Sequence, residues 1–113
     1  MPHFIIDCSE NVLEMKSPEQ IMQRVYDTAD AANLFAKGDI KVRINPFKLY
    51  NIGDAAGFIH VFGNIMEGRT DEQKLSLSKA IVSALKTMLP NVPIISMNIR
   101  DFEKASYCNR SMV

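Results

Sequence analysis

The stretch Pro2-His3-Phe4-Ile5-Ile6-Asp7-Cys8, followed by Ser17-Pro18-Glu19-Gln20, decides the fold. The first segment predicts a strand over residues 2–8 that is apolar on both faces except at His3 and Asp7. The second segment is a capping box, with an N-cap serine, a proline at the first helical position and a glutamine at N3. Apolar residues then recur at helical spacing, and we expect the helix to fade near residues 32–33: Ile21, Val25, Tyr26, Ala29 and Ala32.

The rest of the chain repeats this plan. Alternating apolar and charged residues predict a half-buried strand over residues 39–45, ended by Pro46. Residues 58–66 are apolar enough to predict a strand that is buried on both faces. A second capping box, Thr70-Asp71-Glu72-Gln73, begins a helix that should stop before Pro90. A last strand is expected over residues 94–99.

The order β-α-β, linker, β-α-β predicts an α+β fold with a four-stranded sheet and two helices on one face. We expect one domain over residues 1–113, with internal repeats at about 2–45 and 57–101. The other face of the sheet would then be bare, although its strands are rich in apolar residues. An open apolar face of that size favours association, most simply in a closed ring of identical chains.

Composition excludes several classes of protein. Thirteen basic and thirteen acidic side chains cancel in 113 residues, so nothing suggests binding to nucleic acid or to a membrane surface. No apolar run is long enough to span a bilayer and no secretory signal is evident, so we expect a cytoplasmic protein. Cys8 and Cys108 are expected to be reduced thiols, with Cys8 in the core. The histidines and cysteines lack the spacing of a metal site.

Pro2 is the candidate catalytic residue. If Met1 is removed, Pro2 carries a free secondary amine at the head of an apolar strand. An uncharged amine there could take a proton from one atom of a substrate and return it to another. Many chains begin Met-Pro for no chemical reason, because proline tolerates the first position of a strand.

Other polar residues have simpler interpretations. His60 lies within an apolar strand and is expected to be a hydrogen-bonded core histidine. His3 should point to the face opposite the Pro2 ring, and Met88 and Met97 should fill the core. Tyr107 and Cys108 receive no role.

The N-terminal segment Pro2-His3-Phe4-Ile5-Ile6-Asp7-Cys8-Ser9-Glu10-Asn11 resembles the 5-carboxymethyl-2-hydroxymuconate isomerase family of the tautomerase superfamily. Glu67-Gly68-Arg69-Thr70 and the duplicated plan are similar to that family too. The resemblance covers roughly residues 2–89, whereas residues 101–113 do not resemble the family's tail. It implies a homotrimer, no metal or organic cofactor, and conversion of a dienol acid to its conjugated ketone.

The resemblance also implies roles for individual residues. Pro2 corresponds to the family's base, and Arg69 to an arginine that binds a carboxylate of a di- or tricarboxylate substrate. A second family arginine falls at Lys41, with Arg43 two residues further on. Arginine and lysine bind carboxylates differently, so the substrate acid stays open. The alternatives are a tautomerase for a phenylpyruvate-like enol or a related dehalogenating enzyme, and a non-enzymatic oligomeric binding protein.

Overall fold

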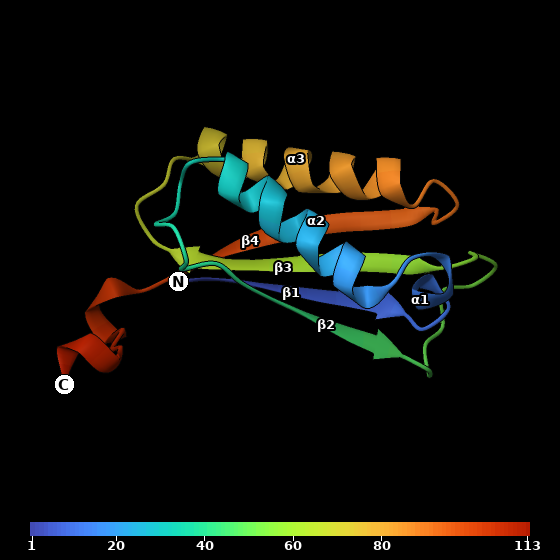
Figure 1. Cartoon of the computed structure of the whole chain (residues 1–113), viewed down its shortest axis with the longest axis horizontal. Coiled ribbons are helices and arrows are strands. Elements are labelled where there is room, and N and C mark those ends of the chain that lie inside the picture. The colour runs from blue at the N-terminus through green and yellow to red at the C-terminus, as the bar shows by residue number, and fades with distance from the viewer.

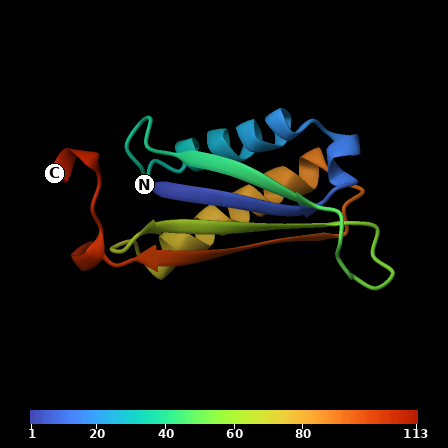
Figure 2. The ribbon, with the colours of Figure 1, turned by 90° about the horizontal axis from the view of Figure 1, so that it is seen from below.

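Two β-α-β units share one mixed sheet with the strand order β2-β1-β3-β4. The computed structural model describes residues 1–113. Two long helices, α2 and α3, cover one face of this sheet, while Figure 2 looks onto the other face, which no helix covers. The elements in chain order are β1 (Pro2–Ser9), α1 (Val12–Met15), α2 (Pro18–Ala31), β2 (Lys41–Phe47), β3 (Phe58–Met66), α3 (Asp71–Met88) and β4 (Ile94–Phe102), followed by the short 3-10 turns η1 (Lys104–Ser106) and η2 (Arg110–Met112).

The strand pairing confirms the predicted plan. Strands β1 and β2 run parallel, as do β3 and β4, because a helix crosses over within each pair. The two central strands, β1 and β3, run antiparallel, with Pro2 opposite Ile65. The head of β1 therefore lies beside the end of β3. The internal repeats at 2–45 and 57–101 stay a prediction.

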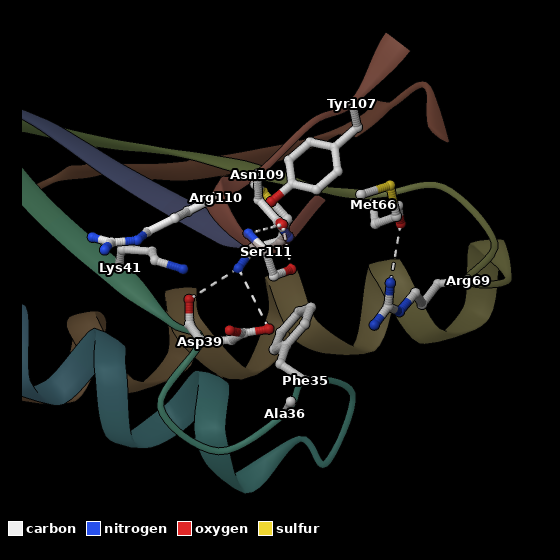
Figure 3. Close-up of a pocket in the computed structure, with 11 residues that line it drawn as sticks. Phe35, Ala36, Asp39, Lys41, Met66, Arg69, Tyr107, Asn109, Arg110 and Ser111 are labelled. Carbon is white, nitrogen blue, oxygen red and sulfur yellow. Dashed lines mark hydrogen bonds and ion pairs between the residues drawn. The ribbon is translucent and has the colours of Figure 1, made fainter. Parts of the chain in front are cut away.

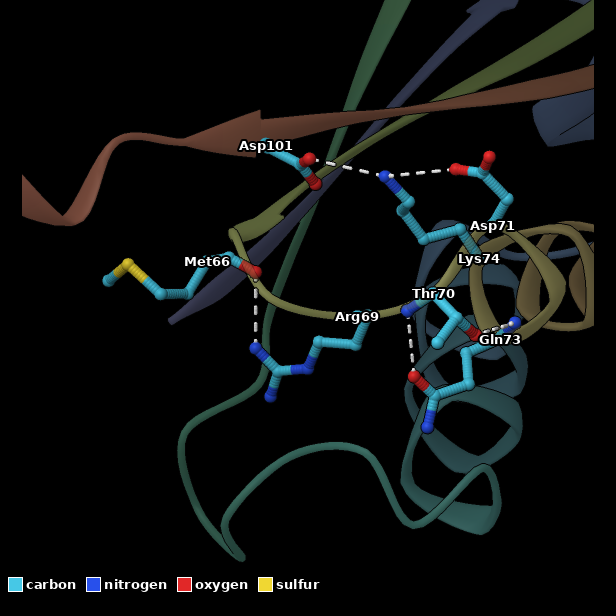
Figure 4. Close-up of polar contacts among 7 residues, drawn as sticks. All are labelled: Met66, Arg69, Thr70, Asp71, Gln73, Lys74 and Asp101. Atoms are coloured by element: carbon cyan, nitrogen blue, oxygen red, sulfur yellow. Dashed lines mark hydrogen bonds and ion pairs between the residues drawn. The ribbon is translucent and has the colours of Figure 1, made fainter.

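Both helices begin at the predicted capping boxes. The Ser17 hydroxyl accepts a hydrogen bond from the Gln20 backbone N–H at 3.2 Å, and the Gln20 side chain accepts from the Ser17 N–H at 3.3 Å. Thr70 and Gln73 repeat this exchange at 3.1 and 2.9 Å (Figure 4). Each box satisfies two N–H groups that a helix start otherwise leaves unpaired. Helix α2 ends at Ala31, as predicted, and α3 ends at Met88, before Pro90.

Two strand boundaries differ from the prediction. Strand β2 begins at Lys41 and continues through Pro46, which the sequence analysis placed at its end. The sheet explains the difference, because β2 is an edge strand, where a missing N–H is tolerated. Strand β4 runs to Phe102, three residues beyond the predicted Ile99. The short helix α1 was not predicted.

The hydrophobic core lies between the sheet and the two helices. It is formed by alternate residues of the central strands and one face of each helix, among them Phe4, Ile6, Cys8, Ile59, Val61, Ile21, Val25, Leu77, Ile81 and Leu85. Met88 and Met97 pack against it, as predicted. Cys8 and Cys108 are both free thiols, and burial raises the pKa of Cys8 to about 11. No helix of the chain is both long and apolar enough to cross a membrane.

The uncovered face of the sheet is not the apolar surface that the sequence analysis predicted. In β3, buried and half-buried residues alternate, so this strand is buried on one face only. Its half-buried residues share the uncovered face with polar pairs. The Asn45 amide donates to Asp7 at 3.3 Å, and the His60 ring bonds the Ser96 hydroxyl at 2.7 Å and the Asn98 amide oxygen at 2.6 Å. His60 is thus hydrogen-bonded as predicted, but it lies outside the core.

Candidate functional site

A cavity of about 600 Å³ opens at the head of β1 (Figure 3). Four segments that are distant in the sequence line it: the N-terminus, the loop from α2 into β2, the turn between β3 and α3, and the C-terminal tail. Their lining residues are Met1, Phe35, Ala36, Asp39, Lys41, Met66, Arg69, Tyr107, Asn109, Arg110 and Ser111.

The sheet pairing explains why these segments meet. In the parallel pair β1–β2, Lys41 stands opposite His3, so the start of β2 lies next to the start of β1. In the antiparallel pair β1–β3, Pro2 stands opposite Ile65, which brings Met66 and the following turn to the same end. Two strand starts and one strand end therefore surround the N-terminus.

The Met1 amine lies in this cavity, directly before Pro2. It donates a hydrogen bond to the Asp39 carbonyl at 3.0 Å and forms an ion pair with the Asp39 carboxylate at 3.7 Å. Partial burial lowers the pKa of this amine, and the neighbouring Lys41 side chain lowers it further. The Pro2 side chain is buried toward the helices. While Met1 is attached, the Pro2 nitrogen belongs to a peptide bond and cannot act as a base.

Arg69 is fixed in the turn before α3. Its guanidinium donates to the Met66 carbonyl at 3.1 Å (Figure 4). It also donates to the Leu34 carbonyl and lies over the Phe35 ring at 5.3 Å. Two of its five N–H donors are thus committed to backbone carbonyls. Arg69 both lines the cavity and ties the loop after α2 to the end of β3.

Of the predicted binding residues, Lys41 and Arg69 line the cavity, but Arg43 does not. Arg43 and Lys41 lie on the same side of β2, as predicted. Arg43 is two residues further along the strand, where its guanidinium meets His3 Nδ1 at 3.1 Å. Because arginine only donates, His3 must accept through Nδ1 and carry its proton on Nε2. His3 points away from the Pro2 side, as predicted.

The pKa of His3 is lowered by burial first and then by the charges of Arg43 and Lys41. The unfolded chain thus binds a proton near pH 6.5 that the folded chain binds only at lower pH. The contribution of His3 to the free energy of unfolding is complete above its pKa in the unfolded chain. That contribution is lost as the pH falls through its pKa in the folded chain. We expect Arg43→Gln to raise the pKa of His3. An NMR titration checks this, with His60 as the internal control, and an unmoved His3 signal would contradict it.

The sequence analysis missed several lining residues. Asp39 provides the single carboxylate of the lining, and Phe35 stacks under Arg69. Tyr107, which received no role, also lines the cavity, together with three other residues of the tail. No periodicity marks these residues, because they lie in irregular segments whose place depends on the whole sheet.

An antiparallel pairing of two β-α-β units around a cavity at the N-terminus is the architecture of small tautomerase-type isomerases, and comparison with known proteins agrees. Residues 2–112 match the 5-carboxymethyl-2-hydroxymuconate isomerase family, and the chain belongs to that family. The match includes residues 101–112, so the prediction that the tail departs from the family is wrong. The chain is 26% identical over 90 residues to the 5-carboxymethyl-2-hydroxymuconate Delta-isomerase of Escherichia coli, covering 77% of this chain and 71% of that protein.

Solved structures share the fold. A 5-carboxymethyl-2-hydroxymuconate isomerase from Deinococcus radiodurans R1 aligns with a TM-score of 0.82 at 23% identity, over 96% of this chain and 88% of that one. Pt0534, inactivated by 2-oxo-3-pentynoate, aligns with a TM-score of 0.80 at 19% identity, over 98% and 94%. A symmetric trimer of fused 4-OT aligns with a TM-score of 0.78 at 14% identity, over 98% and 96%.

Proposed function

We propose that this chain is a cofactor-independent isomerase that converts an unsaturated 2-hydroxy carboxylate into its conjugated 2-oxo form through Pro2. The observation that carries the proposal is the cavity at the head of β1, where the N-terminus, Lys41 and Arg69 meet. Removal of Met1 would turn the Pro2 nitrogen into a secondary amine at the wall of this cavity. Family membership supports an isomerase, and the geometry supports this residue as its base.

The surroundings favour an uncharged amine. The pKa of the Met1 amine is lowered by burial and by Lys41, and the Pro2 amine would lie one residue further into the same corner. In the proposed reaction, the amine takes the proton of the 2-hydroxyl group as the carbon–oxygen double bond forms. The double bonds shift along the chain, and the amine returns the proton to a carbon at their far end. A base with a pKa near the working pH serves both steps.

Cationic side chains of the cavity would attract and hold the carboxylates of the substrate. Arg69 directly precedes Thr70, the N-cap of α3, where the helix dipole also favours an anion. Three of its N–H donors are free of the two backbone carbonyls that it holds. Lys41 would act as a point charge beside the amine. We favour Lys41 over Arg43, because Arg43 lies outside the cavity and is engaged with His3.

A second candidate is a tautomerase for a monocarboxylate enol, such as a phenylpyruvate-like acid. The commitment of Arg69 to two carbonyls favours it, since this leaves a smaller part of the guanidinium for a second carboxylate. The rates with monocarboxylate and dicarboxylate enols separate the two candidates.

We also propose a homotrimer. The uncovered sheet face offers a broad surface for other copies, and the fused 4-OT neighbours are symmetric trimers. Light scattering should give three times the 12.7 kDa of one chain. A monomer at micromolar concentration would contradict this assembly.

The decisive experiment compares two forms of the same chain. One form lacks Met1, as verified by intact mass, and the other is produced with methionine aminopeptidase inhibited, so that Met1 is retained. Ketonisation of a 2-hydroxymuconate dienol is followed by ultraviolet absorbance. We expect catalysis above the buffer rate only without Met1, since only that form has a free Pro2 amine. Equal rates in both forms would refute the Pro2 mechanism, and no rate in either would favour a binding protein.

A further inference from the structure

The C-terminal tail after β4 reaches the cavity that the proposed function uses. Tyr107, Asn109, Arg110 and Ser111 all line it. Figures 1 and 2 both place the N-terminus and the tail at the same end of the sheet. The tail therefore contributes side chains to a site whose other members come from the first two thirds of the chain.

Hydrogen bonds fix the path of the tail. The Glu67 carboxylate accepts from the Lys104 backbone N–H at 2.7 Å, which holds η1 against the turn that carries Arg69. The Asn109 side chain then accepts from the Ser111 backbone N–H at 3.1 Å and from its hydroxyl at 2.7 Å. This cap begins η2 and sets the position of the Arg110 backbone between the two residues.

The Arg110 guanidinium stands at the cavity with its donors uncommitted. It forms no hydrogen bond or ion pair within the chain, whereas Arg69 holds two carbonyls. Asp39, the single carboxylate of the lining, forms no ion pair with Arg110. A free guanidinium presents a planar fork that matches a carboxylate in bidentate geometry.

The cations are also spread across the cavity. Figure 3 shows Arg69 on one side of the lining and both Lys41 and Arg110 on the other. A ligand with a carboxylate at each end of a short chain would place one at Arg69 and the other at Arg110. A ligand with one carboxylate would leave one of the two arginines unused.

We propose that Arg110 is a specificity-determining residue, which binds the second carboxylate of a dicarboxylate substrate while the first binds at Arg69. This inference rests on the proposed function for the identity of the site. The tail then contributes to ligand recognition through Arg110, and the chain prefers dicarboxylates to monocarboxylates of the same length.

Calorimetry with two unreactive probes tests this proposal. Adipate is a saturated six-carbon dicarboxylate, and hexanoate is its monocarboxylate counterpart. We expect Arg110→Gln to weaken adipate binding about tenfold and to change hexanoate binding by less than about twofold. Arg110→Lys should recover part of the loss, because it keeps the charge but not the fork. Lys104→Gln removes a cation of the same tail that does not line the cavity, and it should bind adipate like the wild type.

Three results would overturn the proposal: an equal loss for both probes, no loss in Arg110→Gln, or no adipate binding to the wild type. Since neither probe has an enol, these readings do not depend on proton transfer at Pro2. If neither form with or without Met1 catalysed ketonisation but adipate were still preferred to hexanoate, only the isomerase proposal would be refuted. Isomerase activity without adipate selectivity would refute the role of Arg110 alone.

Discussion

Replacing Pro2 by alanine should lower kcat/KM for a 2-hydroxymuconate dienol by about 10²–10⁴-fold, the usual contribution of a general base. Alanine leaves a primary amine that is less constrained at the strand head, so residual activity is expected. The strand itself should persist, because the other buried residues of β1 are unchanged. Initial rates and circular dichroism measure the two effects separately.

Pro46→Ala is the matched control for this loss. Pro46 is an exposed proline of the edge strand β2 and does not line the cavity, so its replacement should leave kcat/KM within about twofold of the wild type. Full activity of Pro2→Ala, with Met1 shown to be absent by mass, would refute the assignment of the base.

Replacing Arg69 by alanine should reduce both stability and activity. The change removes two charged donors from the Met66 and Leu34 carbonyls and a contact with the Phe35 ring. Allowing for its partial exposure, we expect the free energy of unfolding to fall by about 2–3 kcal/mol. KM for a dicarboxylate enol should rise by about tenfold or more, through loss of a carboxylate-binding group. Urea unfolding and steady-state kinetics measure these effects.

Two variants separate the structural and binding roles of Arg69. Arg69→Lys keeps the charge but not the planar fork that bonds both carbonyls, so it should fall between wild type and Arg69→Ala in stability. Arg24→Ala removes an exposed arginine of α2 and should change the free energy of unfolding by less than about 0.5 kcal/mol. If Arg69→Ala lost stability but kept its KM under folding conditions, Arg69 would be structural only.

Local signals in the sequence predicted most of the fold. The capping boxes at Ser17 and Thr70 are complete within four residues, so the helix starts needed no knowledge of the rest of the chain. The prediction that Pro46 ends its strand was wrong, because whether a proline ends a strand depends on whether the strand lies at an edge of the sheet. The prediction that β3 is buried on both faces, and the uncovered face apolar, was also wrong. His60 and Asn64 are four residues apart and therefore lie on the same face of β3, so the apolar run was already interrupted on one face only.

The site was less predictable than the fold. Pro2 and Arg69 stood out by their chemistry and by the family resemblance, but the structure was needed to separate Lys41 from Arg43. The two side chains are only two positions apart on β2, but Lys41 lies at the cavity and Arg43 lies beside His3. Arg110 lies in a segment without periodicity, and its place depends on a backbone hydrogen bond to Glu67 far away in the chain.

The antiparallel pairing of β1 with β3 gives the sheet two equivalent strand heads at opposite ends, but the polypeptide has one beginning. The first residue of β3 follows a loop and so has no free amine. Two hydrogen bonds hold this end of the strand, from the Phe58 N–H to the Ser9 hydroxyl at 3.1 Å and from the Asn11 amide to the Ala56 carbonyl at 2.7 Å. On the proposed mechanism, two separate single-unit chains would supply two reactive amines per sheet, whereas this joined chain supplies one. Each polypeptide then has one active centre. The residues at the opposite end of the sheet need not take part in catalysis.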